Sequence, residues 1–227
     1  MKYIPGIIAG GSGSVGGCVF SRNRFGSYIR NRSIPVNPGT IEQQAIRNAL
    51  GLLSANWKVL TDVQRDNWTN YALNTPYTDW QGAPITLTGL QMYCAINVPR
   101  LQVGLGGLNN APPTFGLAVV SGLGLTTLVA ATEVLTFIFS NSDTWATAVG
   151  GALLVYISRP QSPTTLFFKG PYQFAGRVNG AVVPPTSPAT VTSPFDYAVG
   201  GRSHVQFRAV QADGKISPVQ RYSILAS

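Results

Sequence analysis

Charged side chains are scarce in this sequence. Asp, Glu, Lys and Arg make up 11% of the 227 residues, less than half of the roughly 25% that is usual for a globular domain. The hydrophobic content of 44% excludes a wholly disordered chain, because such chains have few apolar residues and many charges. A freely diffusing monomer normally carries more surface charge for solubility. The scarcity therefore favours a subunit whose surface is largely covered by neighbours in an assembly.

Histidine and cysteine are almost missing. His204 is the single histidine, and it lies inside a segment that reads as a strand, where a solvent-facing or subunit-facing position is expected. Cys18 and Cys94 are far apart and form no C-x-x-C pair, so a cysteine-based zinc site is not supported. We expect two buried free thiols, with a disulfide as the alternative. No metal site or cofactor is predicted.

The residue patterns of catalysis are also missing. There is no G-x-S-x-G nucleophile elbow and no P-loop motif. The eight carboxylates are scattered along the chain, and no two lie close enough in sequence to indicate an acid–base dyad, although distant carboxylates can still meet in space. We therefore expect a protein that is not an enzyme.

Long hydrophobic runs are absent. The first residues, MKYIPGIIAGGSGS, hold one lysine and a very short apolar run, so they do not read as a secretory signal peptide. The longest apolar candidate, residues 117–131, is interrupted by glycine, serine and threonine, so no membrane span is predicted.

Acidic residues are missing from the first 36 residues, which nevertheless carry five basic ones. The runs CVFS and SYIR flank RNRFG, and we predict a β-hairpin of Cys18–Ser21 and Ser27–Arg32, preceded by a short strand near Ile7. The arginines of this region are candidate binding residues for an acidic partner or for phosphate, and a merely solvated face is the alternative. The candidates are Arg22, Arg24, Arg30 and Arg32.

The same region contains Gly11, Gly13 and Gly16 at the spacing of a dinucleotide-binding loop, G-x-G-x-x-G. That loop requires a helix directly after it and an acidic residue about 20 positions later. Here a strand-forming run follows, and the next acidic residue is Glu42. We interpret the glycines instead as positions that need positive φ or close backbone approach.

Three Thr-x-x-Gln pairs between residues 40 and 103 predict three helices, because such pairs form capping boxes. They are Thr40–Gln43, Thr61–Gln64 and Thr88–Gln91. Apolar residues recur at helical spacing after each pair, and Pro99 is expected to end the third helix. Side chains expected to pack the helices together are Trp57, Leu60, Trp68 and Tyr71. A helix-turn-helix at residues 60–61 is a weaker alternative, because the second helix carries two aspartates.

Residues 112–227 read as six or seven short strands joined by loops rich in proline, glycine and serine. In RSHVQFRAV, for example, Val205, Phe207 and Ala209 share one face and His204, Gln206 and Arg208 the other. An Asp-Gly turn at residues 213–214 joins this run to the last strand. The fold class predicted is α+β. An N-terminal β-hairpin arm and three helices form a domain of residues 1–111, and an antiparallel β-sandwich of immunoglobulin or fibronectin III type forms residues 112–227, with residues 108–115 as the linker.

One stretch of the chain resembles a known group of proteins. It begins at SRNRFGSYIRNRSIPVNPGT and continues into a W-x-x-L-T-x-x-Q-R-x-x-W-x-x-Y-A pattern at residues 57–72 and GLQMYCAINVPRLQVGL at 89–105. Phage and prophage-like proteins with a glycine-rich start, an arginine-bearing hairpin and a Pro-Val-Asn-Pro-x-Thr turn share these features. The resemblance covers roughly residues 6–112. By its composition, the C-terminal part resembles a fibronectin III or immunoglobulin-like accessory domain.

The resemblance implies a structural protein of a tailed phage particle, on the head, neck or tail exterior, made in the host cytoplasm and located in the virion. Its expected partners are other virion proteins and further copies of itself. Two alternatives stay open. One is an adhesion or glycan-binding module that uses exposed aromatic residues, with candidates Trp145, Tyr156, Tyr172 and Tyr197. The other is a DNA-contacting accessory protein that uses the basic hairpin, and nucleic acid is the less favoured partner.

Overall fold

The computed structural model describes residues 11–23, 26–34, 36–78 and 83–227. Contacts within the chain divide it into two compact units, Met1–Ile41 and Glu42–Ser227. This division differs from the predicted boundary between residues 111 and 112, because the three helices share a core with the strands that follow them. The strand expected near Ile7 and the side chain of Arg24 lie outside the described residues.

The first unit contains a three-stranded antiparallel sheet in the order β1 (Gly13–Val15), β2 (Cys18–Asn23) and β3 (Gly26–Asn31). The hairpin of β2 and β3 confirms the prediction, whereas β1 was not predicted. Residues Val15 and Cys18 face each other across the glycine turn that joins β1 to β2. None of the described side chains in this unit is buried.

The second unit begins with helices α1 (Ile41–Val59), α2 (Asp62–Asn74) and α3 (Gly89–Gln102), as predicted. Both later helices begin with reciprocal capping boxes. The Gln64 N–H donates to Thr61 Oγ1 at 3.2 Å, and the Gln91 N–H donates to Thr88 Oγ1 at 3.3 Å. The glutamine side chains accept in return from the threonine N–H groups, at 3.0 and 2.9 Å.

Pro99 does not end α3, so that prediction is wrong. The helix continues to Gln102, with Pro99 and Arg100 both buried. A proline near the end of a helix removes one backbone hydrogen bond, and the loss is small where the next residue is held by other contacts. Here Arg100 donates from Nη1 to the Gln211 carbonyl at 3.0 Å and from Nε to the Gly106 carbonyl at 3.2 Å.

Seven of the remaining strands form two antiparallel sheets. The three-stranded sheet has the order β10-β7-β6, with β6 at Gly124–Val129, β7 at Val134–Ile138 and β10 at Ala189–Thr192. The four-stranded sheet has the order β12-β11-β8-β9, with β8 at Ala152–Ser158, β9 at Tyr172–Asn179, β11 at Arg202–Val210 and β12 at Gln220–Leu225. A short pair, β4 (Tyr77–Thr78) and β5 (Pro84–Ile85), lies between α2 and α3 in the chain.

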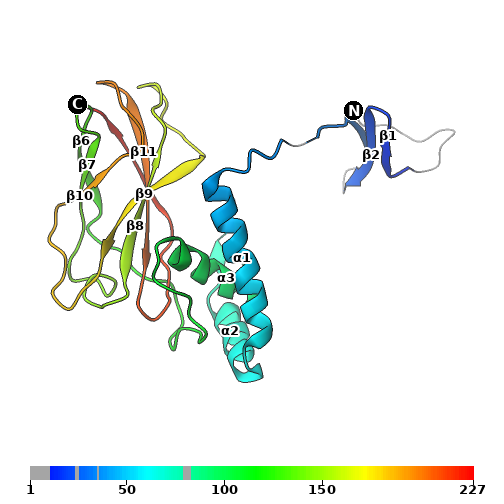
Figure 1. Cartoon of the computed structure of the whole chain (residues 1–227), viewed down its shortest axis with the longest axis horizontal. Helices are drawn as coiled ribbons and strands as arrows, with labels where there is room; N and C mark the ends of the chain where they lie inside the picture. Colours follow the sequence, from blue (N-terminus) through cyan, green and yellow to red (C-terminus); the bar gives the residue numbers. More distant parts are fainter. Residues whose placement is uncertain (1–10, 24–25, 35, 79–82) are drawn as a thin grey trace. The chain divides into compact units, whose positions relative to one another are not determined.

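The second unit therefore has three layers, and the four-stranded sheet is the middle one (Figure 1). Alternate residues of a strand point to opposite faces. In β8, Leu153, Val155 and Ile157 join the core between the two sheets. The intervening Ala152 and Leu154 join a second core with the helices. The predicted α+β class with antiparallel sheets is confirmed.

The segment expected to be a linker is held in place by the helices. Trp68 Nε1 donates to the Asn109 carbonyl at 2.9 Å, and the Tyr71 hydroxyl donates to the Gly116 carbonyl at 2.9 Å. Asn97, fully buried on α3, bonds to both backbone groups of Leu108, at 2.7 and 3.1 Å. These bonds join the helices to the chain that leads into β6.

Candidate functional site

The arginines of the N-terminal sheet do not share one face. Arg22 pairs with Ser27 and Val19 pairs with Arg30. Because residues 19 and 22 of one strand point to opposite faces, Arg22 and Arg30 lie on opposite sides of the sheet. Arg32 lies just beyond β3, where its backbone N–H donates to the Gly17 carbonyl at 2.8 Å. All three side chains are exposed, so the sheet presents positive charge on both sides.

None of the described apolar residues of this sheet is fully buried. Phe20 pairs with Ile29 on the face that carries Cys18, and these residues are half-buried. Val15, on the same face, is 73% exposed. Further along the unit, Ile34 and Val36 are 78% and 90% exposed. A three-stranded sheet normally needs one face buried against something to be stable.

Two of the three spaced glycines adopt the positive φ that was predicted for this run. Gly13 lies in β1 with φ of 111° and Gly16 lies in the turn with φ of 56°. A Cβ placed on either would meet no atom within 4 Å, so conformation and not close approach within this chain explains the glycine. The strand–turn–strand context lacks the helix that a dinucleotide loop requires.

The side chains expected to pack the helices together meet at a residue that the sequence reading missed. Leu60, Trp68 and Tyr71 are buried, and Trp57 is half-buried. Trp57 and Trp68 both contact the ring of Tyr93, with centroid distances of 5.5 and 5.3 Å. Tyr93 lies two residues after Gln91 of the third capping box. The equivalent position after the second box is Asp66, a charged residue, so the capping pattern did not indicate that Tyr93 would be buried between the helices.

A second candidate site is a hollow of about 590 Å³ in the second unit. We call it the α1–α3 hollow, because its walls are Ile46 and Leu50 of α1 together with a stretch of α3 at residues 91–102. Its floor is the outer side of the four-stranded sheet, with Tyr156 on β8 and Gln206 and Arg208 on β11. Sequence reasoning placed Gln206 and Arg208 on the polar face of their strand but did not anticipate a hollow there.

Arg208 on this floor lies in one row across the sheet with a second arginine. Arg208 on β11 pairs with Leu154 on β8, which in turn pairs with Arg177 on β9. Arg208 Nε and Arg177 Nη1 are buried with no hydrogen-bond partner, and they are the two such side-chain atoms in the described ranges. Unpartnered buried donors are rare in native proteins because each is costly.

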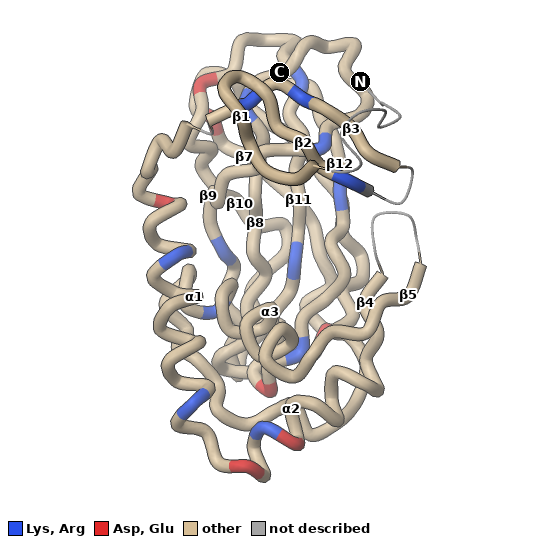
Figure 2. Tube along the Cα trace, turned by 90° about the vertical axis from the view of Figure 1, so that its right-hand side faces the viewer, with Lys and Arg blue, Asp and Glu red and all other residues tan. Residues whose placement is uncertain are grey.

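Arg208 lies near the phenolic hydroxyl groups of Tyr77 and Tyr156. Its Nη2 donates to the Tyr77 hydroxyl over a long 3.5 Å. Burial raises the pKa of Tyr77 and of Tyr156, and the nearby positive charge of Arg208 offsets part of that rise. Both hydroxyls therefore stay protonated at neutral pH. No Asp or Glu occurs in α3 or in the four strands of this sheet, and Figure 2 shows basic but no acidic positions on β9 and β11.

His204 lies neither in solvent nor in a catalytic cluster, so the expectation of an outward-facing histidine is wrong. Its side chain is buried and stacked on Phe168, with ring centroids 5.3 Å apart, and Nε2 lies 3.1 Å from the Thr165 carbonyl. Burial lowers the pKa of its imidazole, with the charge of Arg202 adding to this and the hydrogen bond to Thr165 opposing it. Thr165 and Phe168, in the loop before β9, therefore help to bury the His204 ring of β11.

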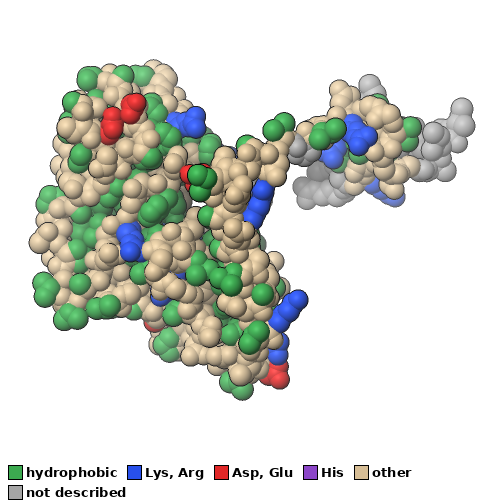
Figure 3. All heavy atoms as spheres, in the orientation of Figure 1, with side chains coloured by type: hydrophobic (Ala, Val, Ile, Leu, Met, Phe, Trp, Pro, Cys, Tyr) green, Lys and Arg blue, Asp and Glu red, His purple; other side chains and the backbone are tan. Residues whose placement is uncertain are grey.

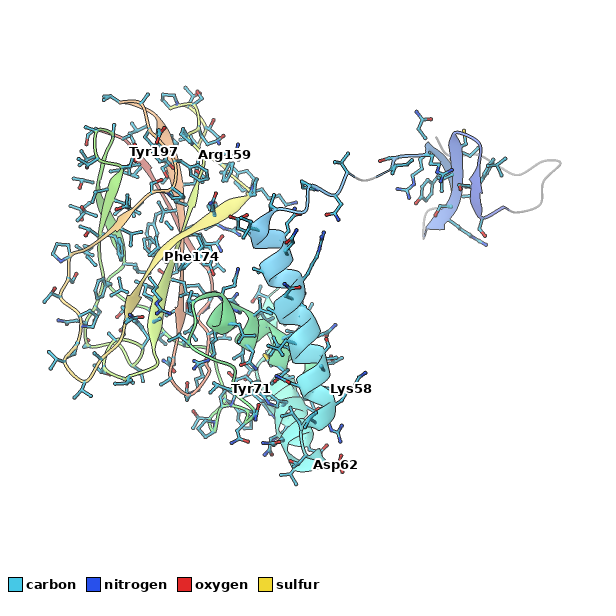
Figure 4. All side chains as sticks on the ribbon, viewed as in Figure 1. Lys58, Asp62, Tyr71, Arg159, Phe174 and Tyr197 are labelled. Atoms are coloured by element: carbon cyan, nitrogen blue, oxygen red, sulfur yellow. The ribbon has the colours of Figure 1, made fainter. Side chains whose placement is uncertain are left out.

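The aromatic residues proposed for glycan binding form no exposed platform. Trp145 and Tyr197 are buried in the core between the sheets. Tyr156 and Tyr172 are half-buried and pack against Phe174 and Phe168. Figure 4 shows Tyr197 among the strands and Phe174 on β9. None of the four is therefore available as a flat ring for stacking on a sugar.

The cysteines and the remaining titratable groups add no further site. Cys18 and Cys94 are free thiols, as expected, but both are half-buried and not fully buried. Within the described part of the chain, no group of His, Cys, Asp and Glu residues is arranged to hold a metal ion, and no helix is long and apolar enough to cross a membrane.

Comparisons with known proteins give no relative. No protein-family model, no curated protein and no solved structure matches the chain.

Proposed function

We propose that this chain is a non-enzymatic structural protein of a tailed phage particle, in which residues 1–41 bind neighbouring subunits and residues 42–227 form a folded body on the particle exterior. The proposal starts from the resemblance of the segment around residues 21–105 to phage and prophage-like proteins. Its working contacts are with other virion proteins and with further copies of the chain. Catalysis plays no part in it.

The single observation that carries the proposal is the exposure of the sheet in the first unit. Its described residues include apolar side chains on both faces, with Phe20 and Ile29 on one and Val19 and Tyr28 on the other, arginines on both faces, and no buried side chain. Such a sheet gains stability when a neighbour covers an apolar face, because burial supplies about 25 cal/mol per Å² of apolar surface. A partner subunit is the covering that an assembly protein would use.

Charge supports the same conclusion. The first 41 residues contain five basic and no acidic groups, so an acidic surface on a neighbouring protein complements them. The body carries few charges for its size, and Figure 3 shows a face on which uncharged atoms predominate. A surface of this kind is suited to contacts with neighbours more than to free diffusion.

We further propose that the two sheets of the body form an immunoglobulin or fibronectin III type of sandwich. With β6, β7, β8, β10, β11 and β12 taken as strands A, B, C, E, F and G, the sheets are A-B-E and C-F-G, as in immunoglobulin domains. β9 extends the second sheet beside strand C. Tyr197 lies before β11, and its hydroxyl donates to the Ser158 backbone carbonyl at the end of β8, which ties the entry to strand F to the end of strand C.

The proposal is tested on purified particles from the phage or prophage that encodes the chain. Quantitative mass spectrometry should find the full chain in the particles at a fixed ratio to the major capsid protein. Reversal of the described arm charges, Arg22→Glu, Arg30→Glu and Arg32→Glu, should reduce incorporation at least tenfold, since each lost charge pair weakens an interface by about 1 kcal/mol or more.

A matched variant controls for the change in net charge. Lys58→Glu, Arg159→Glu and Lys169→Glu change the same number of exposed basic residues in the body and should leave incorporation intact. Absence of the wild-type chain from particles would overturn the proposal. If the arm variant, but not the body variant, binds duplex DNA more weakly than the wild type while particle content is unchanged, the DNA-contacting function is the better description.

A further inference from the structure

The α1–α3 hollow has the size of a small-molecule site. Its volume of about 590 Å³ lies within the range of roughly 300–1,000 Å³ that is typical of ligand pockets. The walls come from two helices and the floor from two central strands of a sheet, so its position depends on packed elements of the fold and not on a loop.

The walls favour an alkyl chain over a ring. The wall residues Ile46, Leu50, Leu87, Ala95 and Val98 are all aliphatic, and the single aromatic residue of the lining is Tyr156. Sugars and bases are normally held by aromatic faces and by several hydrogen-bonding side chains. The walls offer no aromatic face, and their hydrogen-bonding side chains are Gln91 and Gln102 of α3. The aliphatic part of the walls packs well against methylene groups.

The floor favours a negative charge at one end of that chain. Arg208 lines the hollow, and its Nε is a buried donor without a partner. None of the described lining residues is acidic, so the positive charge of Arg208 is not neutralised from within the hollow. A guanidinium binds a carboxylate through two parallel hydrogen bonds. Tyr156 and Gln206 lie beside it on the floor and offer further donors.

We propose that the α1–α3 hollow binds a carboxylate attached to an unbranched alkyl chain, in the manner of a medium-chain fatty acid, with the carboxylate on Arg208 and the chain between α1 and α3. The carboxylate pairs with the positive charge of the Arg208 guanidinium, and the chain covers Ile46, Leu50 and Val98. This site is independent of the assembly contacts proposed for residues 1–41.

Cys94 gives a direct measure of occupancy, because it lines the hollow and is a half-buried free thiol. The experiment uses the full-length chain with Cys18→Ser, so that Cys94 is the one remaining thiol. Its rate of alkylation by iodoacetamide is followed with and without dodecanoate, at concentrations below those at which dodecanoate forms micelles. We expect dodecanoate to slow alkylation at least tenfold and 1-dodecanol, which has the same chain without the charge, to slow it much less.

Two variants identify the groups that bind the probe. Arg208→Gln should weaken dodecanoate protection roughly tenfold to a hundredfold, because a hydrogen bond to a charged group is worth about 1.5–3 kcal/mol. It should leave the small effect of dodecanol unchanged. Ala95→Phe fills the space between the helices and should abolish protection by both probes. Arg159→Gln, at an exposed arginine outside the hollow, is the matched control and should behave as the parent chain.

Three results would overturn the proposal. The first is no protection by dodecanoate, and the second is equal protection by dodecanoate and dodecanol. The third is equal weakening by Arg208→Gln and Arg159→Gln, which would show a non-specific effect of charge. Circular dichroism and the thermal unfolding midpoint of each variant establish that it folds. If Arg208→Gln does not fold, Arg208→Lys tests the same point, since it keeps the charge but loses the paired donors and should weaken protection by an intermediate factor.

Discussion

The rings of Trp68 and Tyr93 meet edge to face, with centroids 5.3 Å apart and an angle of 80° between their planes. Trp68 comes from α2 and Tyr93 from α3, and both are buried. Trp57 of α1 also packs on the Tyr93 ring, with the ring centroids 5.5 Å apart. Tyr93 is thus the residue on which all three helices converge.

Replacement of Tyr93 by alanine should therefore destabilise the second unit strongly. We expect a loss of about 3–5 kcal/mol in the free energy of unfolding, the usual cost of removing a large buried aromatic side chain. Trp57→Ala, at a half-buried ring on the same cluster, should cost clearly less. Urea unfolding followed by far-ultraviolet circular dichroism measures both values. Equal losses for the two variants would show that α1 depends on this cluster as much as α2 and α3 do.

Two glycines in helices give a matched pair with opposite expected effects. A Cβ on Gly89, at the start of α3, would lie 2.5 Å from Thr69 Oγ1 and 3.0 Å from the Thr69 backbone nitrogen on α2. Gly89→Ala should therefore force the helices apart and destabilise the protein. A Cβ on Gly51 in α1 meets nothing within 4 Å, so Gly51→Ala should stabilise it by about 0.5–1 kcal/mol through helix propensity. Thermal unfolding midpoints should move in opposite directions.

Asn97 holds the segment that leads from the helices to the strands. Its Oδ1 accepts from the Leu108 N–H at 2.7 Å and its Nδ2 donates to the Leu108 carbonyl at 3.1 Å. Asn97→Ala leaves both backbone groups without partners, so we expect a loss of about 2–6 kcal/mol, from about one to three for each group. Hydrogen exchange at the Leu108 amide should accelerate by more than the global loss of stability explains. An unchanged exchange rate there would show that another group replaces Asn97.

Alkaline pH should weaken the second unit through Tyr71. Burial raises the pKa of its hydroxyl from 10 to about 12, with the nearby Thr75 hydroxyl opposing the rise. The folded state therefore keeps a proton that the unfolded state releases. This contribution to stability is complete below pH 10 and is lost as the pH rises towards 12, and it amounts to at most about 3 kcal/mol.

The measurement is the free energy of unfolding in urea between pH 8 and pH 11. Tyr71→Phe should reduce the slope of stability against pH without removing it, because burial also raises the pKa of Tyr93 and Tyr197. The variant should be less stable at neutral pH, since the Gly116 carbonyl loses its donor. A slope identical to that of the parent would contradict the assignment to Tyr71.

Local signals predicted the helices well. The boxes at Thr61–Gln64 and Thr88–Gln91 lie where the structure has helix N-termini, because capping depends on residues three positions apart. Lys58 and Asp62 flank the α1–α2 junction seen in Figure 4, close to the position predicted for it. Pro99 misled the prediction, because the sequence alone could not show that Arg100 is anchored by distant carbonyls.

The candidate sites depended on information that a single segment does not contain. The alternation in β11 correctly placed Val205, Phe207 and Ala209 in the core between the sheets. It could not show that helices 100 residues earlier cover part of the opposite face. The row of Arg208, Leu154 and Arg177 follows from the register of three strands, and that register is set by packing across the whole unit.

β8 ties the strands of the second unit to its helices. Its two sides belong to two different cores, one with the opposing sheet and one with the helices. A recombination event that joined residues 112–227 to another protein would leave Leu154, Val210 and Ile216 facing water. The strands therefore cannot be transferred as an independent cassette, and we expect homologous genes to keep the helices and the strands together while the segment before residue 42 varies.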